Sequence, residues 1–180
     1  MLEQPKSAGY DAVLKACEKC YPENKGACNN FVQAVADELE IYVRSGTADQ
    51  MALFLLDNWP VAGSPSEAVS FARAGFLVVA ALPSGFHARR PIKNKKGVVI
   101  GSKNAEHGHI GVVVGGALYH GKYPRIWCGS IGGYGASNGT LSVGEVWSQG
   151  RRKTTWKGDA FGRDDRDEVW YFHSPSLVQA

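Results

Sequence analysis

The stretch GHIGVVVGGALYHGKYPRIWCGS, residues 108–130, decides the fold of this chain. Short apolar runs alternate here with glycines, a pattern typical of short antiparallel strands joined by tight turns. The pattern predicts three strands, HIGVVVGG, ALYHG and RIWCGS, and the sequence EVWYFH at residues 168–173 predicts a fourth. The second half of the chain is therefore expected to form an antiparallel sheet.

Helices are predicted before the sheet, either from apolar residues at helical spacing or from residues that favour a helix start. Their expected positions are Tyr10–Cys20, Cys28–Leu39, MALFLLDNW after a capping box of Thr47 and Gln50, and the segment from Ser64 to Gly75. Pro22 is expected to end the first helix. The apolar run Phe76–Leu82 predicts a buried strand, and Ser142 with Glu145 predicts a one-turn helix.

Helices followed by strands predict an α+β fold, in which the N-terminal helices pack on one face of an antiparallel sheet. This arrangement is also a common scaffold of cysteine peptidases. The length of 180 residues favours a single domain over residues 1–180, and the hydrophobic fraction of 44% excludes a disordered chain. The net charge of +3 indicates no particular class of partner.

Neither a membrane span nor a secretory signal is expected from the sequence. The longest apolar run, Phe76–Leu82, is far shorter than the roughly 20 residues that cross a bilayer. The N-terminal sequence MLEQPKSAGYDAV lacks the basic start and apolar core of a signal peptide. The protein is therefore expected to stay in the cytoplasm or to leave it by another route.

The chain has four cysteines, too few for a framework of disulfides. Cys17 and Cys20 form a C-x-x-C pair, but a structural zinc site needs four ligands and usually a second spaced pair. We therefore expect no metal site, and we read these two cysteines as ordinary positions on a helix.

Cys28 is the only cysteine predicted at the N-terminus of a helix, where backbone N–H groups and the helix dipole lower the pKa of a thiol. Its position fits equally well a buried residue on the apolar face of that helix. His109 begins a predicted strand, where its imidazole can project toward a facing helix end, although a surface or core histidine fits as well. Together the two residues suit a nucleophile and its general base, the pair needed for acyl transfer.

These residues also carry a family resemblance. A cysteine at a helix start, followed downstream by Gly-His-Ile-Gly and an apolar strand, resembles the papain-like NlpC/P60 cell-wall amidases. The blocks CNNFVQAVADEL, AGFLVVAAL, GHIGVVVGGALYHGKYPRIWCGSIGG and SVGEVW are similar, in the same order, to the first family of type VI secretion amidase effectors. The resemblance covers Cys28 to Trp147, and Tyr10–Cys20 resembles the first helix of that family.

The resemblance implies a bacterial toxin that hydrolyses the γ-D-glutamyl–diaminopimelate amide in peptidoglycan stem peptides. It implies Cys28 as the nucleophile, His109 as the general base and Cys128 as a third residue near this pair, and it requires no metal or organic cofactor. The toxin would be made in the cytoplasm without a signal peptide and injected by the type VI secretion apparatus into the periplasm of a rival. A cognate periplasmic immunity protein is then an expected partner, whereas nucleic acid is not.

Several points remain open within this resemblance. His120, eleven residues after His109, rivals Cys128 as the residue that orients the imidazole, and otherwise reads as an exposed turn histidine. The neighbours of Cys28 depart from the D-C-S-G pattern that is frequent in NlpC/P60 enzymes, which leaves the cleaved bond open; they are Ala27, Asn29 and Asn30. The C-terminal cysteine of the effector family has no counterpart here, so its disulfide is not expected.

The polar, basic segment Pro83–Gly108 is unusually long for a loop, and one short strand is expected in it at Val98–Ile100. Within this segment, His87–Lys96 resembles an insertion relative to the effector family. Its cations either hold anionic stem carboxylates near the site or form a solvated loop without a ligand; they are Arg89, Arg90, Lys93, Lys95 and Lys96. The glycine-rich sequence IGGYGASNG, residues 131–139, lacks the lysine of a phosphate-binding loop and is expected to be a flexible loop that borders the cleft.

Two alternative functions remain compatible with the sequence. The same Cys-His pair could deamidate or cross-link a protein glutamine, and the masses of the products would distinguish this reaction from stem-peptide hydrolysis. A non-enzymatic module could instead bind nucleic acid or glycan through residues 89–96. Binding that falls steeply with salt, without turnover that depends on Cys28, would identify such a module.

Overall fold

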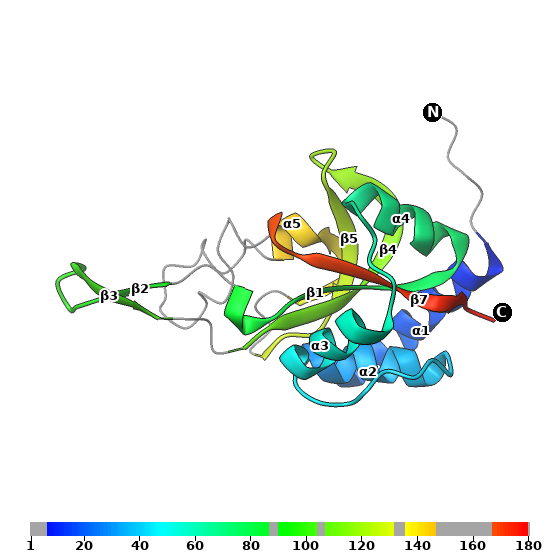
Figure 1. Cartoon of the computed structure of the whole chain (residues 1–180), viewed down its shortest axis with the longest axis horizontal. Helices are drawn as coiled ribbons and strands as arrows, with labels where there is room; N and C mark the ends of the chain where they lie inside the picture. The colour runs from blue at the N-terminus through cyan, green and yellow to red at the C-terminus, as the bar shows by residue number, and fades with distance from the viewer. Residues whose placement is uncertain (1–6, 87–89, 104–106, 132–135, 147–166, 180) are drawn as a thin grey trace.

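A computed structural model describes residues 7–86, 90–103, 107–131, 136–146 and 167–179. Four helices come first: α1 Ala8–Asn24, α2 Cys28–Glu38, α3 Ala48–Asn58 and α4 Pro65–Ala74. The elements that follow are β1 Phe76–Leu82, η1 Ser84–Phe86, β2 Arg90–Lys93, β3 Val99–Lys103, β4 His109–Tyr119, β5 Tyr123–Cys128, β6 Ser137–Ser142, α5 Val143–Val146 and β7 Trp170–Leu177. The predicted α+β fold is confirmed (Figure 1).

The main sheet has five strands in the order β6-β5-β4-β1-β7, and all neighbouring strands are antiparallel. Its register places His109 of β4 opposite Leu82 of β1, and Val112 of β4 opposite Trp127 of β5. The strand β1 lies inside the sheet and residues 77–82 are fully buried. Since both faces of β1 are covered, its sequence is continuously apolar instead of alternating.

Helices cover both faces of this sheet, and each face has its own hydrophobic core. The helices α1, α2 and α3 pack on one face, where Phe31 and Met51 meet Val79 of β1. On the other face α4 and α5 pack against Val78 of β1 and Ile126 of β5. The two groups of helices lie on opposite sides of the sheet in Figure 1. The expectation that the helices share one face therefore holds only for α1–α3.

Local hydrogen bonds explain where three of the helices begin. The hydroxyl groups of Ser7, Thr47 and Ser64 each accept a backbone N–H in the first turn of α1, α3 and α4. The capping box of Thr47 and Gln50 is present as predicted. Gly75 ends α4 with φ 98°, a left-handed conformation that glycine adopts without a steric penalty.

The prediction that Pro22 ends the first helix is wrong, because α1 continues to Asn24 with Pro22 inside it. Proline removes one backbone donor and disturbs the carbonyl four residues earlier. Here the helix extends only two residues further. The side chain of Asn24 donates a 2.9 Å hydrogen bond to the carbonyl of Cys20, which supports this last turn.

Two predictions about the strands are also corrected. HIGVVVGG and ALYHG form one continuous strand, β4, in which Gly116 has φ 136° and the pairing with β5 becomes irregular. Part of the glycine-rich segment expected to be a loop forms β6, which pairs with β5. Residues 132–135 of that segment lie outside the described residues.

The polar, basic segment before His109 contains a hairpin of two strands, where the sequence predicted one. β2 and β3 pair only with each other in a separate two-stranded sheet, which projects from the rest of the molecule in Figure 1. The side chain of Asn94 accepts the N–H groups of Lys96 and Val98 and so shapes the turn. Arg89 lies outside the described residues.

Candidate active site

Cys28 is the first residue of α2, as predicted, and the residue that precedes it cannot cap the helix. Ala27 has an extended backbone, φ −149° and ψ 123°, and makes no side-chain hydrogen bond to the first turn. The α1, α3 and α4 helices use a Ser or Thr hydroxyl for this purpose. At α2 the backbone N–H groups of Cys28 and Asn29 instead face the Cys28 sulfur and favour its thiolate.

The Cys28 thiol also lies against the start of β4. Its sulfur is close to the backbone N–H of Ile110, the residue that follows His109. His109 is the first residue of β4 and is almost fully buried, with its backbone paired to Leu82 of β1. The structure therefore brings the start of α2 and the start of β4 together, although Cys28 and His109 are far apart in the sequence.

The pKa of the Cys28 thiol is raised, which corrects the expectation that the helix start lowers it. Burial of the sulfur is the largest cause and outweighs the backbone N–H groups of Ile110, Asn29 and Cys28, which favour the thiolate. The negative charge of Asp49 raises this pKa further. The resting thiol is thus protonated at neutral pH, and a nucleophilic role would require a base to remove its proton.

Cys128 ends β5 and lies near Cys28, in the region where the resemblance placed it. Its side chain is fully buried, and its sulfur accepts the backbone N–H of Ser137. Burial raises the pKa of Cys128, and the nearby Cys28 raises it further. Cys128 is therefore a neutral thiol beside Cys28 and is unsuited to proton transfer near neutral pH.

Close backbone packing holds the end of β5 against the turn that leads to Cys28. A Cβ atom on Gly129 would lie 2.5 Å from the carbonyl oxygen of Asn24 and 2.7 Å from that of Ala27. The next residue, Ser130, donates its backbone N–H to the carbonyl of Lys25 at 2.9 Å. The motif W-C-G-S thus needs a glycine because the two backbones meet there.

His120 lies at the opposite end of β4 from His109. It is exposed, has φ 51° and belongs to the turn that connects β4 to β5. A strand of 11 residues is about 35 Å long. This placement does not support His120 as the residue that orients the imidazole of His109.

Cys17, Cys20, Trp127 and Trp170 belong to, or pack against, the hydrophobic core on the α1–α3 face of the sheet. Cys17 is buried and Cys20 partly buried, both on α1. Within the described ranges, no group of three or more His, Cys, Asp or Glu residues is arranged to hold a metal ion. Trp127 packs edge-on against Tyr21, and Trp170 packs on the same core. Trp147 and Trp156 lie outside the described residues.

Asp49 is a residue near Cys28 that the sequence analysis did not single out. It stands in the first turn of α3, and its charge acts on the Cys28 thiol. An acidic residue in the first turn of a helix is already explained by the helix dipole. Its sequence position therefore gave no sign of a link to Cys28, and the contacts between α3 and the loop after β1 were needed to find it.

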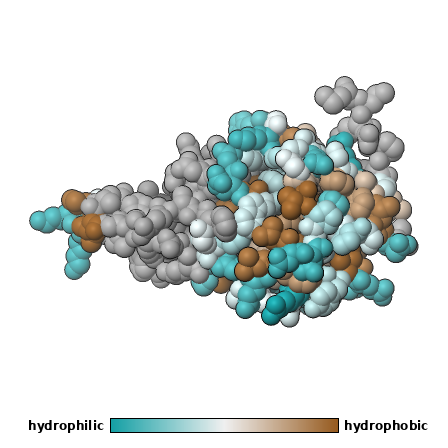
Figure 2. Space-filling view, in the orientation of Figure 1, coloured by the Kyte–Doolittle hydropathy of each residue, from teal (hydrophilic) through white to brown (hydrophobic). Residues whose placement is uncertain are grey.

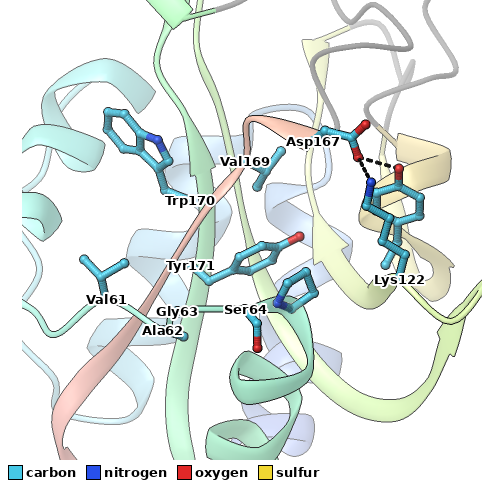
Figure 3. Close-up of a pocket in the computed structure, with 11 residues that line it drawn as sticks. Val61, Ala62, Gly63, Ser64, Lys122, Asp167, Val169, Trp170 and Tyr171 are labelled. Atoms are coloured by element: carbon cyan, nitrogen blue, oxygen red, sulfur yellow. Dashed lines mark hydrogen bonds and ion pairs between the residues drawn. The ribbon is translucent and has the colours of Figure 1, made fainter.

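A separate pocket of about 260 Å³ lies where α4 and β7 begin (Figure 3). Its walls include Tyr171 and an ion pair of 2.7 Å between Lys122 and Asp167, and Tyr123 donates to the same carboxylate at 2.6 Å. Neither Cys28 nor a residue next to it lines this pocket. The pocket is therefore distinct from the candidate active site.

Across the part of the chain that the structure describes, no helix is both long and apolar enough to cross a membrane.

Comparisons with known proteins agree with the family that the sequence blocks indicated. No family model matches the chain, so the NlpC/P60 resemblance rests on its residues alone. The peptidoglycan amidase Tse1 of Pseudomonas aeruginosa is 34% identical over 168 residues, which cover 89% of this chain and 87% of that protein. At this identity and coverage, the chain belongs to the type VI secretion amidase effectors.

Proposed function

We propose that this chain is an antibacterial enzyme that hydrolyses an amide bond in the stem peptides of peptidoglycan, with Cys28 as its nucleophile. One observation carries the proposal: Cys28, a half-buried residue, stands at the uncapped start of α2, and its sulfur lies beside the backbone N–H of Ile110, the residue that follows His109. The relationship to a protein named as a peptidoglycan amidase supports the substrate.

The proposed reaction begins when His109 removes the proton of the Cys28 thiol and the sulfur attacks the carbonyl carbon. The carbonyl oxygen becomes an oxyanion, for which the N–H groups at the start of α2 are suitable donors. The imidazolium then gives its proton to the departing amine as the carbon–nitrogen bond breaks, which leaves a thioester on Cys28. Water attacks the thioester with His109 as the base, releases the carboxylic acid and restores the thiol.

The raised pKa of the Cys28 thiol gives His109 a specific task. A thiol that is protonated in the free enzyme is a weak nucleophile. The general base must therefore take the proton when the substrate is in place, instead of finding a thiolate already formed. Cys128 has a supporting part in this proposal: its buried, neutral thiol holds the end of β5 beside Cys28 and so helps to fix the start of α2.

We assign the γ-D-glutamyl–diaminopimelate amide as the bond that is cleaved, on the basis of the family resemblance. The two asparagines after Cys28 differ in what they can offer a substrate. Asn29 donates its side-chain N–H to the carbonyl of Gly46 at 2.8 Å and is engaged within the protein. Asn30 is exposed in the first turn of α2 and is the one available to contact a stem peptide.

The same proposal includes the biological setting that the family implies. The type VI secretion apparatus would deliver the protein into the periplasm of a rival cell. A producing cell into which neighbouring cells of the same strain inject this toxin would need a periplasmic immunity protein. Such a protein would bind over Cys28 and so prevent the stem peptide from reaching the thiol.

Digestion of purified sacculi by wild-type, Cys28→Ala and Cys20→Ala proteins tests the proposal. Cys20 is the matched control, since it is also a partly buried cysteine on a helix. We expect Cys28→Ala to lose digestion and Cys20→Ala to keep it. Mass spectrometry of the wild-type products should show a free amine on diaminopimelate and a free carboxyl group on D-glutamate.

Each contrary result removes a defined part of the proposal. Undiminished digestion by Cys28→Ala would refute the nucleophile, and a different new terminus in the products would refute the assigned bond. Intact stem peptides together with deamidated or cross-linked protein glutamines would identify the other thioester reaction and remove the cell-wall substrate.

A further inference from the structure

We propose that Asp49 is a positioning residue, which ties the start of α3 to the start of β4 and so sets how His109 is presented to Cys28. The inference rests on the proposed function, because it assigns Asp49 a part in the same reaction. Asp49 need not touch the substrate. It acts through the loop after β1 and through the residue that precedes His109.

The carboxylate of Asp49 holds the loop after β1 by two hydrogen bonds. Its Oδ1 atom accepts the backbone N–H of Ser84 at 2.8 Å, and its Oδ2 atom accepts the Ser84 hydroxyl at 2.5 Å. Ser84 follows closely on Leu82, the residue of β1 that pairs with His109. Hydrogen bonds to a charged acceptor are stronger than those between neutral groups. Asp49 therefore fixes the strand end against which His109 is paired.

Asp49 also packs directly on the residue before His109. A Cβ atom on Gly108 would collide with the Oδ1 atom of Asp49 and would lie 2.9 Å from the carbonyl oxygen of Leu82. Gly108 is thus held between the carboxylate and the end of β1. Since the peptide that precedes His109 has no room to shift toward α3, the entry of the chain into β4 is fixed on this side.

The segment that begins α3 reaches the other half of the site as well. The carbonyl of Gly46 accepts the side-chain N–H of Asn29, the residue after Cys28, at 2.8 Å. Between Gly46 and Asp49, the capping box of Thr47 and Gln50 fixes the first turn of α3. The segment 46–49 therefore contacts the residue after Cys28 through Gly46 and the residue before His109 through Asp49.

The charge of Asp49 gives this role a measurable signature. The groups around the Cys28 sulfur are the Asp49 carboxylate from α3, the Cys128 thiol from β5, the start of β4 with His109, and the N–H groups of α2 and Ile110. The carboxylate disfavours a thiolate and so raises the pKa of Cys28. Removing its charge while keeping its shape should lower that pKa, so that the thiolate forms at a lower pH.

The first measurement is the rate at which iodoacetamide alkylates Cys28 as a function of pH, followed by mass spectrometry of the peptide that contains it. We expect the midpoint to move to lower pH in Asp49→Asn, because the amide oxygen can still accept the Ser84 N–H without carrying a charge. Ser84→Ala keeps the charge and should leave the midpoint unchanged. Asp57→Asn changes an exposed aspartate on the same helix and should also have no effect.

The second measurement is the digestion of sacculi, with kcat and KM determined separately. Asp49→Ala removes both hydrogen bonds, and we expect kcat to fall about tenfold or more with KM nearly unchanged, since small displacements of a catalytic group slow the chemical step. Asp49→Asn and Ser84→Ala each retain part of the link, so a loss of only a few-fold is expected. A helix cap alone would change stability without moving the alkylation midpoint.

A wild-type midpoint in Asp49→Asn, or a wild-type kcat in Asp49→Ala, would overturn the inference. If Asp49→Ala does not fold, the Asn and Ser84→Ala variants decide the question. The Cys28→Ala variant separates this result from the proposed function. Digestion that survives Cys28→Ala refutes the thiol mechanism itself, whereas its loss together with an unmoved midpoint refutes only the role of Asp49.

Discussion

Two regions near His109, one that surrounds it in space and one that precedes it in the sequence, differ sharply in how tightly they pack against the rest of the protein. We call the first the α2–β4 corner, which comprises Cys28, His109 and Cys128 with their backbone neighbours. There Cys128 is fully buried and the backbone at Gly129 excludes even a Cβ atom. The second is the β2–β3 hairpin, in which Val98 and Ile100 are exposed by 56% and 65%. Figure 2 shows hydrophobic surface at this projecting end.

The difference indicates which region can perform chemistry. Acyl transfer needs a nucleophile and a base that keep their mutual geometry to within about half an ångström. Packing from several elements can hold such a geometry, and α2, β4 and β5 pack together with α3 at the corner. A two-stranded hairpin is marginally stable by itself. Lys95 and Lys96 in its turn are exposed, so the hairpin does not offer the packing that such a geometry needs.

The largest expected effect compares the two histidines at the ends of β4. His109→Gln should lower the rate of sacculus digestion about 10²–10⁴-fold, the usual contribution of a general base. His120→Gln should leave the rate within about twofold of wild type, because that residue is exposed in a turn away from the corner. Release of soluble stem fragments per unit time measures both. Equal losses for the two variants would show that the corner is not where the reaction occurs.

The next effect compares two isoleucines, one near the corner and one in the hairpin. Ile126 of β5 is fully buried, and its Cδ1 atom lies over Gly111. Ile126→Ala should lower the free energy of unfolding by about 2–5 kcal/mol, since the structure can only partly fill the cavity. Ile100→Ala removes an exposed side chain and should change it by less than about 0.5 kcal/mol. Chemical denaturation measures both, and a cost at Ile100 similar to that at Ile126 would mean that the hairpin is packed in solution.

The elements that could be predicted are those whose cause lies within a few residues. Thr47 bonds to the turn that it caps, and the run Phe76–Leu82 is apolar throughout, so both are readable from the sequence. The elements that were predicted wrongly depend on contacts with residues far away in the sequence. Residues 137–142 form a strand because β5 offers a partner, and nothing in SNGTLS predicts one. Similarly, β4 continues past Gly115 and Gly116 and pairs with β5 again at Tyr119, which a break predicted from the glycines did not anticipate.

The features of the candidate site also separate into those that local sequence patterns predict and those that depend on distant parts of the chain. Cys28 at a helix start and His109 at a strand start follow from local patterns, and their pairing was expected from the family resemblance. The raised pKa of Cys28 was not predictable, because burial of its sulfur depends on elements that are brought together only by folding. The link from Asp49 to Ser84 and Gly108 joins three separate segments and leaves no pattern in any one of them.

The smallest effect tests a single backbone contact of the corner. Gly129→Ala places a Cβ atom against the carbonyl oxygens of Asn24 and Ala27, which are backbone atoms and cannot move without displacing the start of α2. We expect the free energy of unfolding to fall by about 1–3 kcal/mol. Gly26→Ala is the matched control, because it lies in the same turn and its Cβ atom would meet nothing within 4 Å. Denaturation and sacculus digestion should both be measured. Gly129→Ala should also slow digestion, because Cys28 follows Ala27 directly and a displaced Ala27 backbone would move the thiol. A stable and fully active Gly129→Ala variant would show instead that the turn can change its conformation without moving the Cys28 thiol.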